Sequence, residues 1–294
     1  MNFGQVLTAM VTPFDQNGEV DFNATKKLIN YLINNGSDGL VVAGTTGESP
    51  TLSTEEKVAL FKFVVDEVAG RVPVIAGTGS NNTRASINLT RQAQETGVNG
   101  ILLVVPYYNK PSQEGLYQHF KAIAESTTLP IMLYNIPGRS VVNLSVDTIV
   151  RLAELPNIVS IKEASGNLNA MAEIISQTPD HFTLYSGDDG LTLPVLAIGG
   201  VGVVSVASHV IGNDMQAMVN CFKNGQILEA SAAHRRLLPI MTALFAAPNP
   251  SPVKAALNMN GIRVGSVRLP LVPLTSDETL TLQKVLPTSK VEIG

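Results

Sequence analysis

The sequence predicts an α/β fold in which eight buried parallel strands alternate with helices. Short apolar runs rich in β-branched residues recur along the chain, at intervals of roughly thirty residues that shorten toward the end. Each run is apolar on both faces, which is typical of parallel strands covered by helices, and a segment of helical period follows it. Eight such units closing on themselves form a TIM (β/α)8 barrel, a fold of about 250 residues.

The alternative architecture is an open, doubly wound sheet. Such a sheet normally has a glycine-rich turn after its first strand, and residues 12–18 (TPFDQNG) do not provide one. The barrel is therefore favoured, with strands expected at residues 6–12, 39–44, 72–77, 100–106, 130–135, 158–164, 182–187 and 202–206.

Helix signals agree with this count. Ser53 and Glu56 have the spacing of a capping box before an amphipathic segment. After the eighth strand about ninety residues remain, which is more than one closing helix needs. We therefore expect a barrel over residues 1–223 and an appended C-terminal helical region, residues 224–294, packed on it. The helices expected in this part of the chain lie near residues 213–223, 226–246, 252–260 and 276–286.

The composition excludes several classes of function. The chain has 294 residues, of which 45% are hydrophobic and 15% charged, and its net charge of −4 offers no basic stripe for nucleic acid. No uncharged apolar stretch is long enough to span a bilayer, and the first residues do not resemble a signal peptide. A single cysteine, Cys221, indicates a reducing compartment. We expect a cytoplasmic protein without nucleic-acid or membrane partners, and its four histidines show no metal-ligand spacing.

Lys162 is the strongest candidate for a catalytic residue. It lies near the end of the sixth apolar run, where a strand in a parallel barrel delivers its last side chain, and Tyr134 occupies the matching place one strand earlier. A lysine is rarely buried without a reason, and burial makes an amine a nucleophile toward carbonyl carbons. Period-two alternation places Glu163 on the opposite face of the strand. The pair Lys162 and Tyr134 predicts a Schiff-base enzyme in which the phenol transfers protons.

The loop after the second strand, residues 44–50 (GTTGESP), is a candidate anion site. Glycines on both sides of Thr45 and Thr46 expose backbone N–H groups and hydroxyls to a small carboxylate. A plain strand-to-helix turn explains the same residues equally well. The hydroxyls of Thr45, Thr46, Tyr107 and Tyr108 are also available to carry a proton onward from Tyr134.

Two further loops follow the fifth and seventh strands. Arg139 lies in a Pro-Gly loop five residues beyond Tyr134, where its planar guanidinium suits a substrate carboxylate. The turn after the seventh strand begins at Gly187, and we expect the two aspartates that follow it to cap a helix beginning at Leu191 rather than to bind a metal ion.

The ordered motifs resemble those of the class I pyruvate aldolase family of TIM barrels over essentially the whole chain. The resemblance implies a Schiff-base lyase that needs no metal or organic cofactor and condenses pyruvate with L-aspartate 4-semialdehyde to 4-hydroxy-tetrahydrodipicolinate, in lysine and diaminopimelate biosynthesis. It also implies a homo-oligomer, a tetramer built as a dimer of dimers. The motifs that carry the resemblance are GTTGES, IAGTGSNNT, PYYNKPSQEGLYQHF, LYNIPGR, IKEASG, YSGDD, GVVSV, NPSPVK and VRLPL.

The resemblance assigns a role to each candidate residue. Lys162 forms the imine with pyruvate, and Tyr134 exchanges protons through Thr45 and through Tyr108 of a neighbouring subunit. The remaining candidates bind substrate: Thr46 and the backbone around Val204 hold pyruvate, Arg139 receives the carboxylate of the aldehyde, and Gly187 belongs to the same pocket.

Lysine-inhibited members of this family carry a regulatory cleft, from which the sequence departs. Lys57 stands where a histidine is common, and Ala85 where a glutamate would bind the amine of the effector. We therefore expect weak or absent inhibition by lysine.

Two other functions remain open. A sister aldolase acting on sialic acid or a sugar acid would share the lysine, the tyrosine and the barrel, but Arg139 favours a short carboxylated aldehyde. A catalytically inactive barrel that only binds a keto acid is the second alternative.

Overall fold

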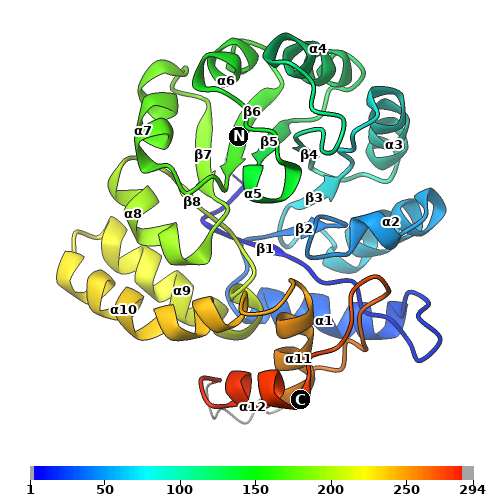
Figure 1. Cartoon of the computed structure of the whole chain (residues 1–294), viewed down its shortest axis with the longest axis vertical. Helices are drawn as coiled ribbons and strands as arrows, with labels where there is room; N and C mark the ends of the chain where they lie inside the picture. The colour runs from blue at the N-terminus through cyan, green and yellow to red at the C-terminus, as the bar shows by residue number, and fades with distance from the viewer. Residues whose placement is uncertain (1–2, 287–294) are drawn as a thin grey trace.

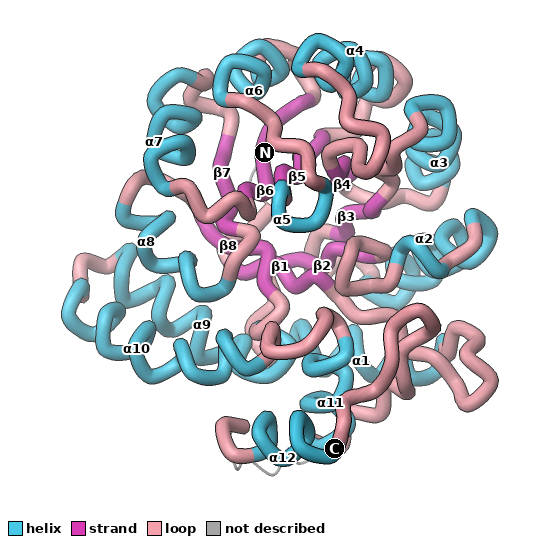
Figure 2. The backbone as a smooth tube through the Cα atoms, in the orientation of Figure 1, coloured by secondary structure: helices cyan, strands magenta, loops and turns pink. Residues whose placement is uncertain are grey.

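The computed structural model describes residues 3–286, and within them the strands form one closed parallel barrel in the order β1 to β8 (Figures 1 and 2). The predicted TIM barrel is confirmed. Several strands end earlier than predicted, the first by three residues, because the chain leaves the sheet after Ala9 and Thr12 donates instead to the carbonyl of Gly47. The strands are β1 (Val6–Ala9), β2 (Gly39–Val42), β3 (Val74–Gly77), β4 (Gly100–Val104), β5 (Ile131–Asn135), β6 (Ile158–Glu163), β7 (Thr183–Ser186) and β8 (Gly202–Ser205).

Helices between the strands form the outer ring of the barrel (Figure 2). Most of them begin at a residue whose side chain accepts a hydrogen bond from a backbone N–H of the first turn. At Ser53 the predicted capping box with Glu56 is complete. The ring consists of α1 (Phe22–Asn34), α2 (Thr54–Val68), α3 (Thr83–Glu95), α4 (Gln113–Ala124), α6 (Val146–Ala153), α7 (Leu168–Gln177), α8 (Thr192–Ala197) and α9 (Ser208–Lys223).

The predicted C-terminal helices are also present. Helix α10 (Ile227–Ala243) packs against α9, α11 (Ser251–Met259) contacts α9, and α12 (Ser276–Gln283) packs on α11. These helices lie at one side of the barrel in Figure 1. Residues 287–294 of the predicted C-terminal region lie outside the described residues.

The side chains form two apolar layers, one on each face of the barrel wall. The inner layer fills the barrel with residues such as Leu7, Val41, Ile75 and Met132. The outer layer joins the other face of each strand to the helices. Each fully buried side chain of this size contributes about 1.5–3 kcal/mol, so the two layers hold the strand ends rigidly in place.

A β-bulge in β6 sets the alignment of the strand ends. Ile131 is paired with Ile158, but the next residue of β5, Met132, is paired with Ser160, so Val159 is an extra residue. From there the register continues without interruption to the pair Tyr134 and Lys162.

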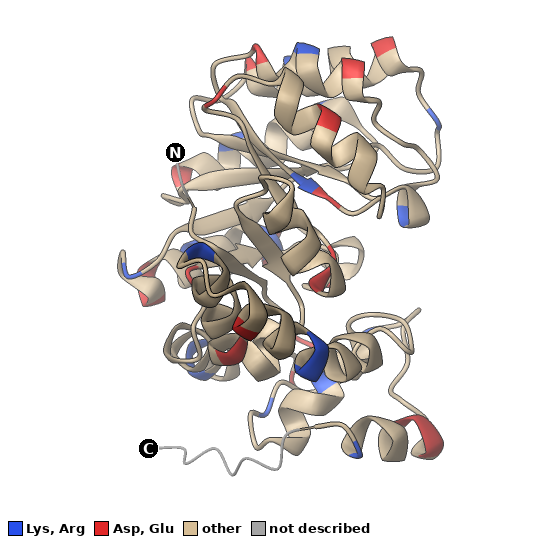
Figure 3. Ribbon diagram, turned by 90° about the vertical axis from the view of Figure 1, so that its left-hand side faces the viewer, with Lys and Arg blue, Asp and Glu red and all other residues tan. Residues whose placement is uncertain are grey.

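The surface carries charges of both signs. Figure 3 shows basic and acidic residues interspersed along the helices. Within residues 3–286, none of the helices combines the length and the apolar character needed to cross a membrane.

Candidate active site

The predicted pairing of Lys162 with Tyr134 is confirmed. The two residues are register partners at the carboxyl ends of β6 and β5, and both are buried, with only 5% of Lys162 exposed. The Nζ atom of Lys162 lies 4.2 Å from the centroid of the Tyr134 ring. Among the described residues, no carboxylate forms an ion pair with this amine. The ammonium form therefore has an aromatic face beside it but no counter-ion.

Tyr185 flanks Lys162 on the other side, in β7. Its hydroxyl donates a 3.0 Å hydrogen bond to the carbonyl of Gly4, and burial raises its pKa to about 12. Tyr185 is therefore a neutral phenol directed to the opposite end of the barrel from the strand ends. The two tyrosines beside Lys162 thus differ, and Tyr134 is the one that lines a cavity.

Glu163 points away from Lys162, as predicted, and stabilises the strand ends from outside the barrel. Its carboxylate accepts hydrogen bonds from Asn135 Nδ2 at 2.9 Å and from the N–H of Ser165 at 2.7 Å. Burial raises the pKa of this carboxyl group. Asn135 in turn bonds to Asn143 and to the N–H of Leu144, in the segment that follows α5 (Pro137–Ser140). The residues next to Tyr134 and Lys162 therefore hold the segment that follows α5, the short helix that carries Arg139.

A cavity of about 270 Å³ opens at this end of the barrel, where α5 lies across the ring of strands in Figures 1 and 2. It combines apolar walls with the hydroxyls of Thr45, Tyr107 and Tyr134 and the guanidinium of Arg139. The volume suits a small organic acid. The cavity is lined by residues Ala43–Thr45, Ser49, Pro50, Lys57, Gly77, Gly79, Ser80, Leu102, Val104, Tyr107, Tyr134, Ile136, Arg139 and Ser140.

Three predicted site residues, Lys162, Thr46 and Val204, are buried and do not line this cavity. Lys162 lies against the ring of Tyr134, which does line it. Gly187 packs on the stem of Lys162, because a Cβ atom at this position would approach the lysine Cε to 3.2 Å and Ala164 Cβ to 2.6 Å. A side chain at position 187 would therefore clash with Ala164 and crowd the stem of Lys162.

The loop of residues 44–49 is a tight turn. The N–H of Glu48 donates to the carbonyl of Thr45, and the N–H of Ser49 donates to the carbonyl of Gly44. Glu48 has a φ of 56°, a left-handed conformation that is uncommon for a non-glycine residue. Thr46 accepts a 2.9 Å hydrogen bond from Asn249 Nδ2, a contact that the sequence analysis did not foresee.

Tyr107 and Tyr108 occupy different places. Tyr107 lines the cavity, whereas Tyr108 is 88% exposed and has a φ of 75°. The structure therefore does not bring Tyr108 to Lys162 within one chain.

The expectation for the aspartates after β7 is only partly correct. Asp188 accepts a hydrogen bond from the N–H of Gly190 and caps a short 3₁₀ turn. Asp189 instead accepts from Ser205 and from the N–H groups of Val206 and Ala207. It is fully buried and ties the end of β7 to the end of β8, a contact between distant segments that local sequence patterns do not predict.

Comparisons with known proteins identify the family of this chain. The model of the dihydrodipicolinate synthetase family matches residues 2–289. A 4-hydroxy-tetrahydrodipicolinate synthase from Bacillus velezensis is 65% identical over 286 residues, which cover 97% of this chain and 99% of that protein. The crystal structure of dihydrodipicolinate synthase from Bacillus anthracis is 63% identical, with a TM-score of 0.96 and coverage of 97% of this chain and 98% of that one.

A lysine-bound crystal structure of DHDPS from Cyanidioschyzon merolae is 50% identical. Its TM-score is 0.95, and the match covers 96% of this chain and 97% of that one. The resemblance indicated by the motifs is thereby confirmed over nearly the whole chain.

Proposed function

This chain belongs to the dihydrodipicolinate synthetase family, and we propose that it works through a Schiff base on Lys162. It condenses pyruvate with L-aspartate 4-semialdehyde to 4-hydroxy-tetrahydrodipicolinate, a step of lysine and diaminopimelate biosynthesis. The observation that carries the role of Lys162 is its position, buried at a strand end beside Tyr134 and, within residues 3–286, without a carboxylate partner.

The first half of the reaction activates pyruvate. The neutral amine of Lys162 adds to C2 of pyruvate, and the carbinolamine loses its hydroxyl as water to leave an imine. Tyr134 donates the proton that this departure requires and afterwards takes one back. Loss of a proton from C3 then gives the enamine, because the protonated imine nitrogen accepts the electron pair.

The second half forms the new carbon–carbon bond. The enamine carbon attacks the aldehyde carbon of L-aspartate 4-semialdehyde, and the aldehyde oxygen takes a proton and becomes the hydroxyl of the product. The amine of the same substrate then adds to C2 and displaces Lys162, which returns as a free amine. The ring closes in this step, so no separate hydrolysis is needed.

We assign the substrate contacts as follows. The hydroxyl of Thr46 and the backbone at Val204 hold the carboxylate and keto group of pyruvate, next to Lys162. Arg139, at the rim of the cavity, pairs with the carboxylate of the aldehyde. Gly187 leaves space beside the reacting amine.

The assembly and location complete the proposal. Tyr108 is exposed and held in a left-handed conformation, which suits a side chain that enters a neighbouring subunit and joins Thr45 and Tyr134 there. We infer a homotetramer, a dimer of dimers, in the cytoplasm.

Borohydride trapping tests the assignment of Lys162. Reduction in the presence of pyruvate should fix a stable mass increase on the peptide that contains Lys162, and K162M should show none. A mass increase on another peptide, or none in the unmodified chain, would refute the mechanism. Turnover with L-aspartate 4-semialdehyde but not with sialic acid then separates this function from that of a sister aldolase.

A further inference from the structure

A buried ion pair joins the loop of Thr45 and Thr46 to the C-terminal helices. The carboxylate of Glu48 lies 2.6 Å from Nζ of Lys254, and both side chains are almost completely inaccessible. The second oxygen of Glu48 accepts a 2.8 Å hydrogen bond from the N–H of Arg268. Because Glu48 is the residue in the left-handed conformation, these contacts hold the turn at its most strained position.

Lys254 is held by more than the carboxylate. Its Nζ atom donates to the carbonyl of Ser266 at 2.7 Å and lies 4.1 Å from the centroid of the Phe14 ring. Burial lowers its pKa to about 8, against the opposing effect of Glu48. Such a lysine has no freedom to leave its partner without leaving a buried charge uncompensated.

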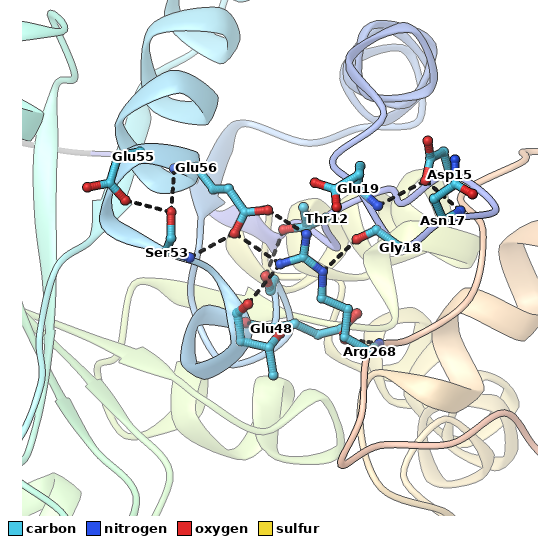
Figure 4. Close-up of polar contacts among 12 residues, drawn as sticks. Thr12, Asp15, Asn17, Gly18, Glu19, Glu48, Ser53, Glu55, Glu56 and Arg268 are labelled. Atoms are coloured by element: carbon cyan, nitrogen blue, oxygen red, sulfur yellow. Dashed lines mark hydrogen bonds and ion pairs between the residues drawn. The ribbon is translucent and has the colours of Figure 1, made fainter.

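Arg268 extends the cluster toward α2, as Figure 4 shows. Its guanidinium donates to the carbonyls of Gly18 and Thr51 and forms an ion pair with Glu56. Glu56 is also the residue that completes the capping box of α2 with Ser53. The C-terminal segment is thus bonded to the connection between β2 and α2 at Glu48 and Thr51, and to the first turn of α2 at Glu56.

A second contact reaches the loop directly at Thr46. Asn249, just before α11, donates its amide N–H to the hydroxyl oxygen of Thr46. A hydroxyl that accepts this bond keeps its own proton available for another acceptor. The contact fixes the position of the Thr46 hydroxyl, and within the described residues no other group accepts from it, so its proton can be donated to a carboxylate ligand.

We propose that Glu48, Lys254 and Asn249 are positioning residues for the pyruvate step, through which the C-terminal helices orient Thr45 and Thr46 toward Tyr134 and the substrate. This inference rests on the proposed function. Asn249 bonds to Thr46, and Glu48 bonds to Lys254 and to the N–H of Arg268, so each of the three acts through the loop and not on the substrate. The loop is held at Thr46 by a neutral hydrogen bond and at Glu48 by a buried ion pair.

The double variant E48Q/K254M tests the ion pair without leaving either charge alone. We expect a folded protein whose KM for pyruvate rises about tenfold or more, with a slower rate of borohydride trapping, because small displacements of binding groups have large kinetic effects. The KM for L-aspartate 4-semialdehyde should change less than twofold, roughly, since Arg139 lies on a different loop. K62M is the matched control, because Lys62 forms an exposed ion pair with Asp66 far from the loop.

The variant N249A tests the other contact and removes no charge. It should raise the KM for pyruvate in the same direction while the melting temperature changes little, and it decides the question by itself if E48Q/K254M does not fold. E48D, which keeps the charge of Glu48, should have a KM for pyruvate between those of E48Q/K254M and the unmodified protein.

The outcomes separate this inference from the proposed function. Unmodified protein that does not trap pyruvate on Lys162 would refute the proposed function. Normal trapping in that protein, together with unchanged pyruvate KM in folded E48Q/K254M and N249A, would overturn the positioning role alone. Equal losses for both substrates that follow the loss of melting temperature would also overturn it, because they indicate a purely structural contact.

Discussion

Lys162 and Lys254 are buried lysines with similar surroundings and different partners. In each, the Nζ atom lies over the face of an aromatic ring. The distance to the ring centroid is 4.2 Å for Lys162 and Tyr134, and 4.1 Å for Lys254 and Phe14. Lys254 is paired with Glu48, whereas Lys162 forms no ion pair among the described residues. Burial alone therefore does not distinguish a lysine that can act as a nucleophile from one that serves the fold. The absence of a carboxylate leaves one amine available for chemistry, and its presence makes the other a structural cation.

The largest effect is expected at the unpaired lysine. K162M should lower kcat by at least about four orders of magnitude, because the reaction loses its covalent intermediate. Its free energy of unfolding should stay the same or rise, since a buried polar group is replaced by an apolar one of similar length. Steady-state kinetics and urea unfolding measure both. Measurable pyruvate trapping in K162M would contradict the assignment.

The phenol beside that lysine gives the next effect. Y134F keeps the ring next to Lys162 but removes the hydroxyl, so kcat should fall by about 10²- to 10⁴-fold. Slow trapping of pyruvate should remain, which distinguishes this variant from K162M. If Y134F retained full activity, a different group would have to transfer the proton.

Substitution of the paired lysine, Lys254, should have the opposite effects from K162M, because it lowers stability and leaves pyruvate trapping in place. K254M leaves Glu48 buried without its cation, and the cost in unfolding free energy should be about 3–5 kcal/mol. Under conditions where the variant is folded, borohydride should still trap pyruvate on Lys162. A fully stable K254M would show that the ion pair contributes nothing to the fold.

The buried histidines His209 and His119 should have a smaller effect, which is a dependence of the free energy of unfolding on pH. Burial lowers the pKa of His209 and of His119 to about 4, so both are neutral in the native protein while the unfolded chain titrates near 6.5. Between these values the unfolded state binds more protons, so stability falls as the pH decreases from 6.5 toward 4. The slope is about 1.4 kcal/mol per pH unit for each histidine.

Urea unfolding at pH 7.5 and 5.5 measures this loss, and H209N should reduce it. His209 is the sharper test because its Nε2 accepts a hydrogen bond from the N–H of Val11, which protonation would break. Equal pH dependence in H209N and the unmodified chain would contradict the prediction.

The smallest effect concerns a third lysine. Lys57 is half-buried at the edge of the cavity, near Ser49 and Ser80, and burial lowers its pKa. A cation at this place opposes the amine of a lysine effector, and Ala85 supplies no carboxylate for it. We expect millimolar lysine to change the initial rate very little, and K57H/A85E to become more sensitive. Strong inhibition of the unmodified chain would show that other groups bind the effector.

The sequence was sufficient to locate the barrel and the two strand-end residues because both depend on local patterns. Apolar runs mark the strands, and alternation within them gives the faces of Tyr134, Lys162 and Glu163. The extra residue Val159 was not predicted, because a bulge adds one apolar residue to a run that is already apolar on both faces. The C-terminal end of β1 was placed too far along for a related reason, since Met10 and Val11, which follow the strand, continue its apolar run.

The contacts of the C-terminal helices could not be predicted for a different physical reason. Lys254 lies in an otherwise apolar helix face, and the NPSPVK motif that contains it was recognised only as part of the resemblance. The ion pair between Lys254 and Glu48 and the hydrogen bond from Asn249 to Thr46 each join residues about two hundred positions apart in sequence. No periodicity of the sequence predicts such a pairing, so these contacts can be identified only in the folded structure.

The bulge in β6 also restricts how such a site can arise. If β6 ran straight through Val159 without a bulge, Tyr134 would be paired with Ile161, and the amine of Lys162 would project toward the surrounding helices. No exchange of one amino acid for another corrects a change of this kind, because every later side chain of the strand is inverted with it. A strand one residue shorter, without Val159, would pair Lys162 with Tyr134 and need no bulge, so the chain can carry the extra codon here only because the bulge absorbs it.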